Sequence, residues 1–428
     1  MIRFIVVLCF SWAMTTGSVV LADATQDYNK AFTAYEKKDY ATALKLLKPL
    51  AEQGNTKAQF FIGVMYINGW GVKQNKNTAL QWLTKAAEQG DADVQYYLGL
   101  QYSLGDRFKQ DDNKAIHWIT KAAEQGLAKA QYNLGRKYSL GYGFKQDDSK
   151  AIHWMTKAAK QGHVYAQYHL GLMYANGKGV KQDDGKVLEW ITKAAEQGHV
   201  TAQYHLGLMY DIGEGVKQDD SKALQWITKA AGQNHVKAQY YLGSRYAKGE
   251  GVKQDYSKAL QWFTKAAEQG DADAQYNLGL MYAKGDGVQP NDIKAVKWYT
   301  KAAEQGHADA QYYLGVSYAH GVGIKQDDNK AMRWLTKAAE QNDTTAQYLL
   351  GLMYADGEGV KQDKGKAVQW LTKAAEQNDT TAQYLLGLMY VDGEGVKQDK
   401  GKAIQWLTKA AEQGDANAQQ ALKLLNIK

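Results

Sequence analysis

The sequence contains one cysteine and two prolines in 428 residues, and its one long apolar run lies at the start. The cysteine, Cys9, falls inside that run, so the rest of the chain has no disulfide, no cysteine-based metal site and no cysteine nucleophile. Scarce prolines together with 42 glycines are typical of helices joined by short glycine turns. The stability of such a chain must come from packing.

The first residues resemble an export signal rather than a membrane span. Residues 2–14 are mostly apolar, Arg3 precedes most of them, and small residues follow as far as Ala24. The apolar run is shorter than the ~18–20 residues that a span needs. We predict a signal peptide over 1–24, cleaved after Ala22 or Ala24, with no integral membrane segment afterwards. The mature protein is then periplasmic, or secreted beyond the periplasm.

The charge is nearly balanced. Lys and Arg number 52 and Asp and Glu number 45, which leaves a net charge of +7. Nucleic-acid binding needs basic residues gathered on one face, and this balance does not indicate it. We predict a solvated surface of mixed charge and no nucleic-acid partner.

An internal repeat with a period of 36 residues dominates the rest of the chain. Two ladders show this spacing without insertion or deletion. The tryptophans stand at 82, 118, 154, 190, 226, 262, 298, 334, 370 and 406, and the glycines at 63, 99, 135, 171, 207, 243, 279, 315, 351 and 387. The chain therefore contains ten repeats.

Each repeat predicts two helices. In the first, helix A, Ala274, Leu278 and Tyr282 stand at i, i+4 and i+8 and share one face. Gly279 flanks that face, and its return in every repeat predicts close contact with a neighbouring helix. In the second, helix B, the recurring tryptophan is predicted to belong to the core.

The helix ends carry the expected signals. Asp or Asn precedes helix B, as at Asn291 and Asp327, and a glycine pair follows helix A. Helix B ends at Gly, or at Asn234, Asn342 and Asn378 in the same register, and both residue types tolerate left-handed backbone. Terminal caps complete the array. We predict a helix pair over 25–54, ten repeats over 55–414 and a capping helix over 415–428.

The unit Ala-Gln-Tyr-x-Leu-Gly-x-Met-Tyr-x-x-Gly-x-Gly-Val, continued by Lys-Ala-x-x-Trp-x-x-Lys-Ala-Ala-Glu-Gln-Gly, resembles the Sel-one-like repeat, a relative of the tetratricopeptide repeat. The resemblance covers residues ~55 to ~420. It implies an all-α, right-handed superhelical solenoid of antiparallel helix pairs that scaffolds protein complexes, with envelope or host proteins as partners. A cysteine-rich branch of the family binds penicillin; this chain lacks the paired cysteines of that branch.

The face of helix A opposite the Ala–Leu–Tyr face is the predicted binding surface, and the resemblance implies that it lines a concave groove. An aromatic residue recurs there, and tyrosines suit recognition. The alternative is that these rings pack between neighbouring helices. The predicted protein-binding residues are Tyr96, Tyr132, Arg136, Tyr168, Tyr204, Asp211, Tyr240, Ser244, Tyr276 and Tyr312.

No pattern indicates catalysis, a cofactor or a metal. Phosphate-binding loops and hydrolase motifs are absent from the sequence. Histidines that share a register on adjacent repeats lie roughly 10 Å apart, too far for joint coordination at ~2 Å. We therefore predict a non-enzymatic adaptor for a protein partner. The alternative is a protein that binds cell-wall polymer (peptidoglycan or polysaccharide) or a cell-wall-active enzyme, for which an acidic pair in the groove would be needed.

Overall fold

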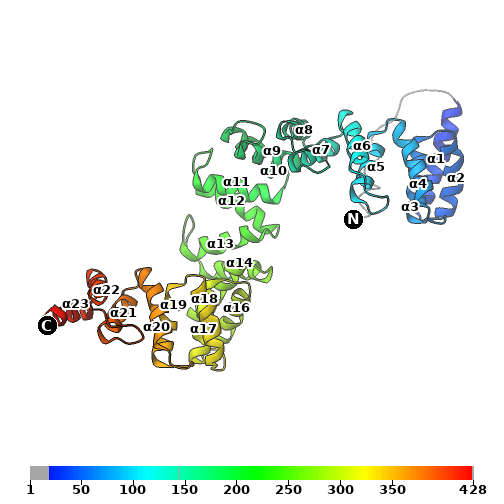
Figure 1. Ribbon diagram of the computed structural model, residues 1–428. Helices are drawn as coiled ribbons and strands as arrows, with labels where there is room; N and C mark the ends of the chain where they lie inside the picture. Colours follow the sequence, from blue (N-terminus) through cyan, green and yellow to red (C-terminus); the bar gives the residue numbers. More distant parts are fainter. Residues whose placement is uncertain (1–18, 144, 427–428) are drawn as a thin grey trace. The chain divides into compact units, whose positions relative to one another are not determined.

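The computed structural model describes residues 19–143 and 145–426. These residues form 23 α-helices and no strand, so the fold is an all-α solenoid of helix pairs. The chain divides into two compact units, residues 1–218 and 219–428. Within each unit, successive helices lie side by side in chain order (Figure 1).

Unit 1 contains one cap pair, four complete repeats and the A helix of the fifth. Its helices are α1 (Val19–Glu36), α2 (Tyr40–Glu52), α3 (Thr56–Asn68), α4 (Lys76–Glu88), α5 (Ala92–Leu104), α6 (Asp112–Glu124), α7 (Ala128–Leu140), α8 (Asp148–Lys160), α9 (Val164–Asn176), α10 (Asp184–Glu196) and α11 (Val200–Ile212).

Unit 2 begins with a B helix and ends with a single helix. Its helices are α12 (Asp220–Gly232), α13 (Val236–Lys248), α14 (Tyr256–Glu268), α15 (Ala272–Lys284), α16 (Asp292–Glu304), α17 (Ala308–His320), α18 (Asp328–Glu340), α19 (Thr344–Asp356), α20 (Lys364–Glu376), α21 (Thr380–Asp392), α22 (Lys400–Glu412) and α23 (Ala416–Asn426). From α3 onwards, odd numbers are A helices and even numbers are B helices.

The apolar part of the predicted signal peptide, residues 2–14, lies outside the described residues. The two predicted cleavage positions, Ala22 and Ala24, lie within α1. Among the described helices, none is both long and apolar enough to span a membrane. The export signal stays a prediction.

The predicted helix ends are confirmed. Asn291 begins α16 by accepting a hydrogen bond from the backbone N–H of Lys294 at 2.9 Å. Asn342 and Asn378 take the left-handed conformation after their B helices, each with φ 67°, as the glycines do in other repeats. In the loop between α15 and α16, Gly287 has φ 70°, and a Cβ there would lie 2.6 Å from the backbone of Tyr256. This glycine therefore lets the loop rest on the preceding B helix.

The core of a repeat is a contact between small residues and one large side chain. Ala274 and Leu278 of α15 are fully buried in one cluster with Ala266 and Ala267 of the preceding helix, α14. A Cβ added to Gly279 would lie 2.5 Å from the ring of Tyr299, so this glycine makes room for the residue that follows the tryptophan. The same contact recurs in other repeats, with Leu, Ile, Met or Phe in place of Tyr299. The predicted close approach at the glycine ladder is confirmed.

The tryptophans do not form the core that the sequence suggested. Trp118 and Trp190 are buried, each with 8% exposure, whereas the other eight of the series are half-buried. Trp298 packs on the buried cluster that α14 of the preceding repeat forms with α15 of its own repeat, and the ammonium group of Lys301 lies 4.3 Å from its ring centre. The helical period places the tryptophan near the core. The buried position, however, belongs to the next residue, and the tryptophan covers the joint between two repeats.

A glutamine relay connects the repeats within each unit. Gln275, which is 4% exposed, donates from Nε2 to the carbonyl oxygen of Ala267 in the preceding B helix at 3.0 Å. Its Oε1 accepts a hydrogen bond from Gln305 at the end of the following B helix at 2.8 Å. Equivalent pairs are Gln59–Gln89, Gln95–Gln125, Gln131–Gln161, Gln167–Gln197, Gln239–Gln269, Gln311–Gln341, Gln347–Gln377 and Gln383–Gln413. The glutamine that ends helix B therefore has a structural partner and is more than a solvated helix end.

Candidate protein-binding surface

All ten predicted binding residues lie on A helices. The helix-A surface is defined here by the positions of Tyr276, Leu280 and the last helical residue, Lys284, in each repeat. Arg136 is exposed, and the other nine predicted residues are half-buried. Unit 1 holds Tyr96, Tyr132, Arg136, Tyr168, Tyr204 and Asp211, and unit 2 holds Tyr240, Ser244, Tyr276 and Tyr312.

The tyrosine rings pack between neighbouring repeats. In unit 1, Tyr132 stacks on His163 with ring centres 4.6 Å apart, and Tyr168 stacks on His199 at 4.5 Å. In unit 2, Tyr276 stacks on His307 at 4.6 Å. Burial raises the pKa of Tyr96 to about 12, so its hydroxyl stays neutral. The ring faces therefore serve packing, and the edges and neighbouring side chains remain for a partner.

The histidines that stack on these tyrosines also cap the A helices, a role that the sequence did not predict. Nδ1 of His163, His199, His235 and His307 accepts a hydrogen bond from the backbone N–H three residues later, at 3.1–3.3 Å. Asn or Asp fills the same register in most other repeats, for example Asn55 and Asp271. The exchange of His with Asn or Asp in one register could have predicted this capping role, because Asn and Asp are strong N-caps.

We expect stability to fall as the pH drops below about 6.5, the ordinary pKa of histidine. Burial lowers the pKa of His163, His169, His199 and His205 in unit 1. The unfolded chain therefore takes up protons that the folded chain does not, and the folded state loses relative stability until the pH passes the lowered values. Urea unfolding at pH 7.5 and pH 5.5 measures this loss.

The matched variant for this experiment is His163→Asn/His199→Asn, which keeps a side-chain acceptor at both helix starts. Its urea midpoint should change less with pH than that of the natural chain. Equal pH dependence in both proteins would show that the two caps do not carry the effect.

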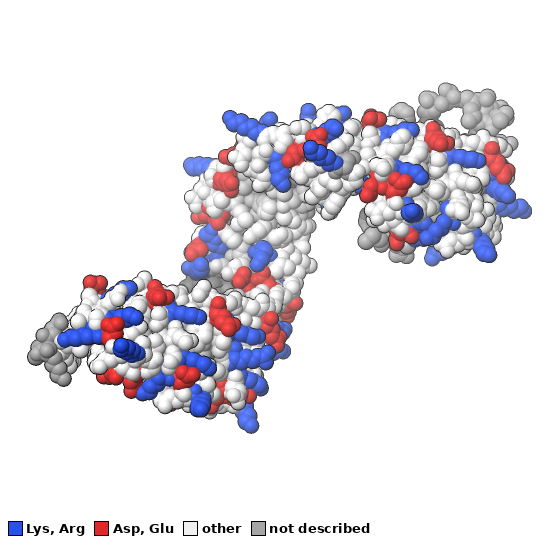
Figure 2. Space-filling model, in the orientation of Figure 1, with Lys and Arg blue, Asp and Glu red and all other residues white. Residues whose placement is uncertain are grey.

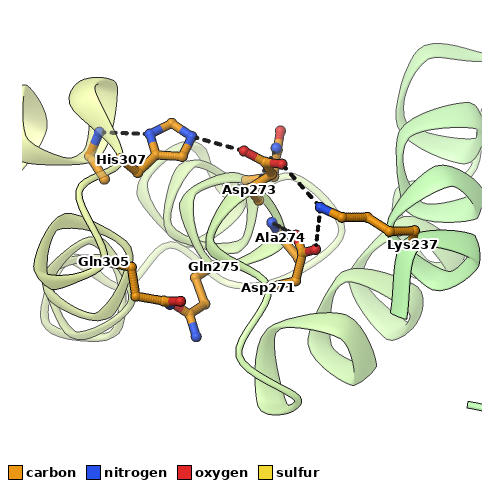
Figure 3. A network of polar contacts seen from close by, with 9 residues as sticks. Lys237, Asp271, Asp273, Ala274, Gln275, Gln305 and His307 are labelled. Carbon is orange, nitrogen blue, oxygen red and sulfur yellow. Dashed lines mark hydrogen bonds and ion pairs between the residues drawn. The ribbon is translucent and has the colours of Figure 1, made fainter. Parts of the chain in front are cut away.

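A polar network joins three successive A helices in unit 2 (Figure 3). Lys237 of α13 places its ammonium 2.9 Å from Asp271 and 3.6 Å from Asp273. Asp271 has a side chain only 3% exposed and also caps α15 through the N–H of Ala274 at 3.0 Å. Asp273 lies 3.5 Å from Nε2 of His307. Because the hydrogen bond to Asp271 raises the pKa of Lys237, the ammonium stays charged and the network fixes the A helices side by side.

The two arginines next to the helix-A surface differ in their contacts. Arg136 lies with its guanidinium 6.0 Å from the ring centre of Tyr132. In unit 2, Ser244 stands in the register of Arg136, and the following residue, Arg245, donates from Nε to the hydroxyl of Tyr241 at 2.8 Å. Arg136 is therefore the more exposed cation of this surface.

The described residues include no metal site, and the face in Figure 2 has no large area of one charge. Among residues 19–143 and 145–426, no group of three or more His, Cys, Asp or Glu side chains is placed to hold a metal ion. On the face shown in Figure 2, Lys and Arg are interspersed with Asp and Glu in both units. The helix pairs, the glutamine relay and the stacked tyrosines together define a helical-repeat protein whose variable side chains lie on the A helices.

Comparisons with known proteins agree with this class. The chain is 40% identical to a protective antigen present in uropathogenic Escherichia coli strains that displays an SLR fold, with a TM-score of 0.80 over 88% of this chain and 80% of the antigen. It is also 40% identical to a Sel1 repeat protein from Oxalobacter formigenes, with a TM-score of 0.58 over 72% of this chain and 90% of that protein. The comparison with curated proteins found no match.

The sequence matches the Sel1 repeat at residues 34–55 and in ten consecutive segments from 56–91 to 380–415. The chain belongs to the Sel1 repeat family. Proteins of this family generally act as scaffolds for protein interactions, and their fold is generally non-catalytic.

Proposed function

We propose that this protein is an exported scaffold that binds a segment of another protein along its helix-A surface. The observation that carries the proposal is a contrast between registers. The packing positions repeat the same residues, such as the buried glutamine and the ladder glycine, in every complete repeat. On the helix-A surface, the last helical residue instead changes: it is Asn68, Leu104, Leu140, Asn176 or Ile212 in unit 1 and Lys248, Lys284, His320 or Asp in unit 2.

Export is supported by two observations. The first residues have the order of a signal peptide. The similar Escherichia coli protein is a protective antigen, a role that export favours because antibodies reach exported proteins. We expect a mature chain that starts at Asp23 or Thr25 in the periplasm or the medium, as measured by mass spectrometry of each cell fraction. A cytoplasmic chain that retains residues 1–24 would contradict export.

Protein binding is better supported than binding of a cell-wall polymer. Sugars stack on free aromatic faces, whereas His163, His199 and His307 already cover one face of the tyrosines beside them. Exposed apolar residues at helix ends are better suited to protein side chains. Leu104 is 68% exposed, and Leu140 is 49% exposed.

The test is a pull-down from envelope extract with the variant Leu104→Lys/Leu140→Lys. Lysine stands in the same register at Lys248 and Lys284, so we expect the variant to fold. The matched control is Tyr256→Lys/Ile293→Lys, which alters exposed residues at the start of two B helices. A partner retained by the natural chain and the control, and lost from the folded variant, is the expected result. A partner retained equally by all three proteins would place binding on another surface.

A further inference from the structure

A depression of about 210 Å³ opens between α7 and α9 in unit 1. Its apolar lining comes from Met155, Leu172 and Met173. Arg136 and Lys178 supply two positive charges, and the described lining residues include no carboxylate. The depression therefore combines an apolar interior with positive charge at its side.

The charge of Arg136 is available to a partner. Its side chain is exposed beside the ring of Tyr132, and no ion pair of Arg136 is found among the described residues. Folding of the repeat does not need an arginine at this position, since Leu100, Leu172 and Leu208 stand in the same register. An arginine presents a planar fork of donors that fits a carboxylate.

Apolar residues next to the depression are also left in water. Leu140, which lines it, is 49% exposed, and Tyr142, two residues later, is 62% exposed. In unit 2, the register of Leu140 carries charged side chains such as Lys284 and Asp356. Exposed apolar side chains in the register of Leu140 thus occur in unit 1 and are not imposed by the repeat.

We infer that this site, the Arg136 site, binds an extended acidic segment of a partner protein in which Asp or Glu adjoins an apolar residue. The carboxylate pairs with Arg136 and Lys178, and the apolar side chain enters between Leu140 and Met173. A charge-assisted pair of this kind is stronger than a neutral hydrogen bond. The inference rests on the proposed function, since it names the partner chemistry for one part of the helix-A surface.

The experiment selects a library of random linear peptides on the purified protein. The expected result is enrichment of peptides that contain Asp or Glu beside Leu, Ile, Val or Met. Fluorescence polarisation then compares an enriched peptide with its Asn or Gln counterpart. We expect Arg136→Leu to lower the affinity for the acidic peptide about tenfold or more, because one charge-assisted pair is lost. Its affinity for the amide counterpart should change little. Arg136→Lys should restore part of the affinity. The control is Arg333→Gln, which alters an exposed residue of α18 in unit 2 and should leave the affinity unchanged.

The outcomes separate the inference from the proposed function. The inference is overturned if the enriched peptides lack acidic residues, or if acidic peptides bind Arg136→Leu as tightly as the natural chain. In either case the proposed function still stands if the Leu104→Lys/Leu140→Lys variant no longer binds the enriched peptides. Absence of any enrichment on the natural chain counts against both. Retained circular dichroism of Arg136→Leu shows that a loss of binding is not a loss of folding.

Discussion

Replacing Gly243 by alanine is expected to lower the free energy of unfolding of the α13–α14 pair by about 1–3 kcal/mol, although alanine is the better helix former by about 1 kcal/mol. The added Cβ would lie 2.6 Å from Cδ1 of Phe263, a buried ring that has no free space to move into. Either the two helices separate or the ring leaves its rotamer, and both responses weaken the contact. Hydrogen exchange read by mass spectrometry over α13 and α14 measures the local loss.

Gly232→Ala is the matched control. Gly232 is the last residue of the neighbouring helix α12, and a Cβ there meets nothing within 4 Å. Alanine at this site should be neutral or slightly stabilising, because only helix propensity changes. If both alanines stabilise the protein, the glycine ladder is not a packing requirement.

The second large effect is expected at Gln275. Gln275→Leu has about the same side-chain size but removes the side-chain donor to the carbonyl oxygen of Ala267, which keeps only the backbone N–H of Gly270 at 3.1 Å. Loss of one intramolecular hydrogen bond costs about 0.5–1.5 kcal/mol, and Gln275→Leu also removes the acceptor of Gln305. We therefore expect faster hydrogen exchange at the α14–α15 joint and a lower urea midpoint.

Gln305→Ala separates the two halves of the relay. Gln305 is exposed, so its removal breaks the 2.8 Å bond to Gln275 and opens the Oε1 of Gln275 to water. The expected loss is small, below about 1 kcal/mol, because water replaces the missing partner. Losses of equal size in the two variants would mean that the carbonyl contact of Gln275 is not the stabilising one.

Much of the fold was predictable because a helix leaves local traces in sequence. The cap at Asn291, the left-handed Asn342 and the close approach at Gly279 each depend on residues within one helix pair. The hydrogen bond from Gln275 to Ala267 and the packing of Trp298 join different repeats. The helical period predicts on which face of its own helix a side chain lies. It does not predict which neighbouring repeat packs against that face. For that reason Trp298 was predicted as core and the relay was missed.

The binding surface was predicted less completely for the same reason. The tyrosine register was found correctly on helix A, and Arg136 is exposed as a binding residue must be. The stacking of Tyr132 on His163 depends on the spacing between two repeats, which periodicity alone does not provide. Whether the ten predicted residues bind a partner stays a prediction.

The spacing of the relay bears on how this chain evolves. Each inter-repeat hydrogen bond of the relay joins the buried glutamine of an A helix to an alanine carbonyl at the same position of the preceding B helix. Unequal recombination that deletes or copies one whole repeat therefore restores each bond at the new junction. Segments 344–379 and 380–415 differ only at Ala355/Val391, Val368/Ile404 and Asn378/Gly414. Copy number can thus change in a single genetic event, while the A-helix side chains diversify afterwards one codon at a time.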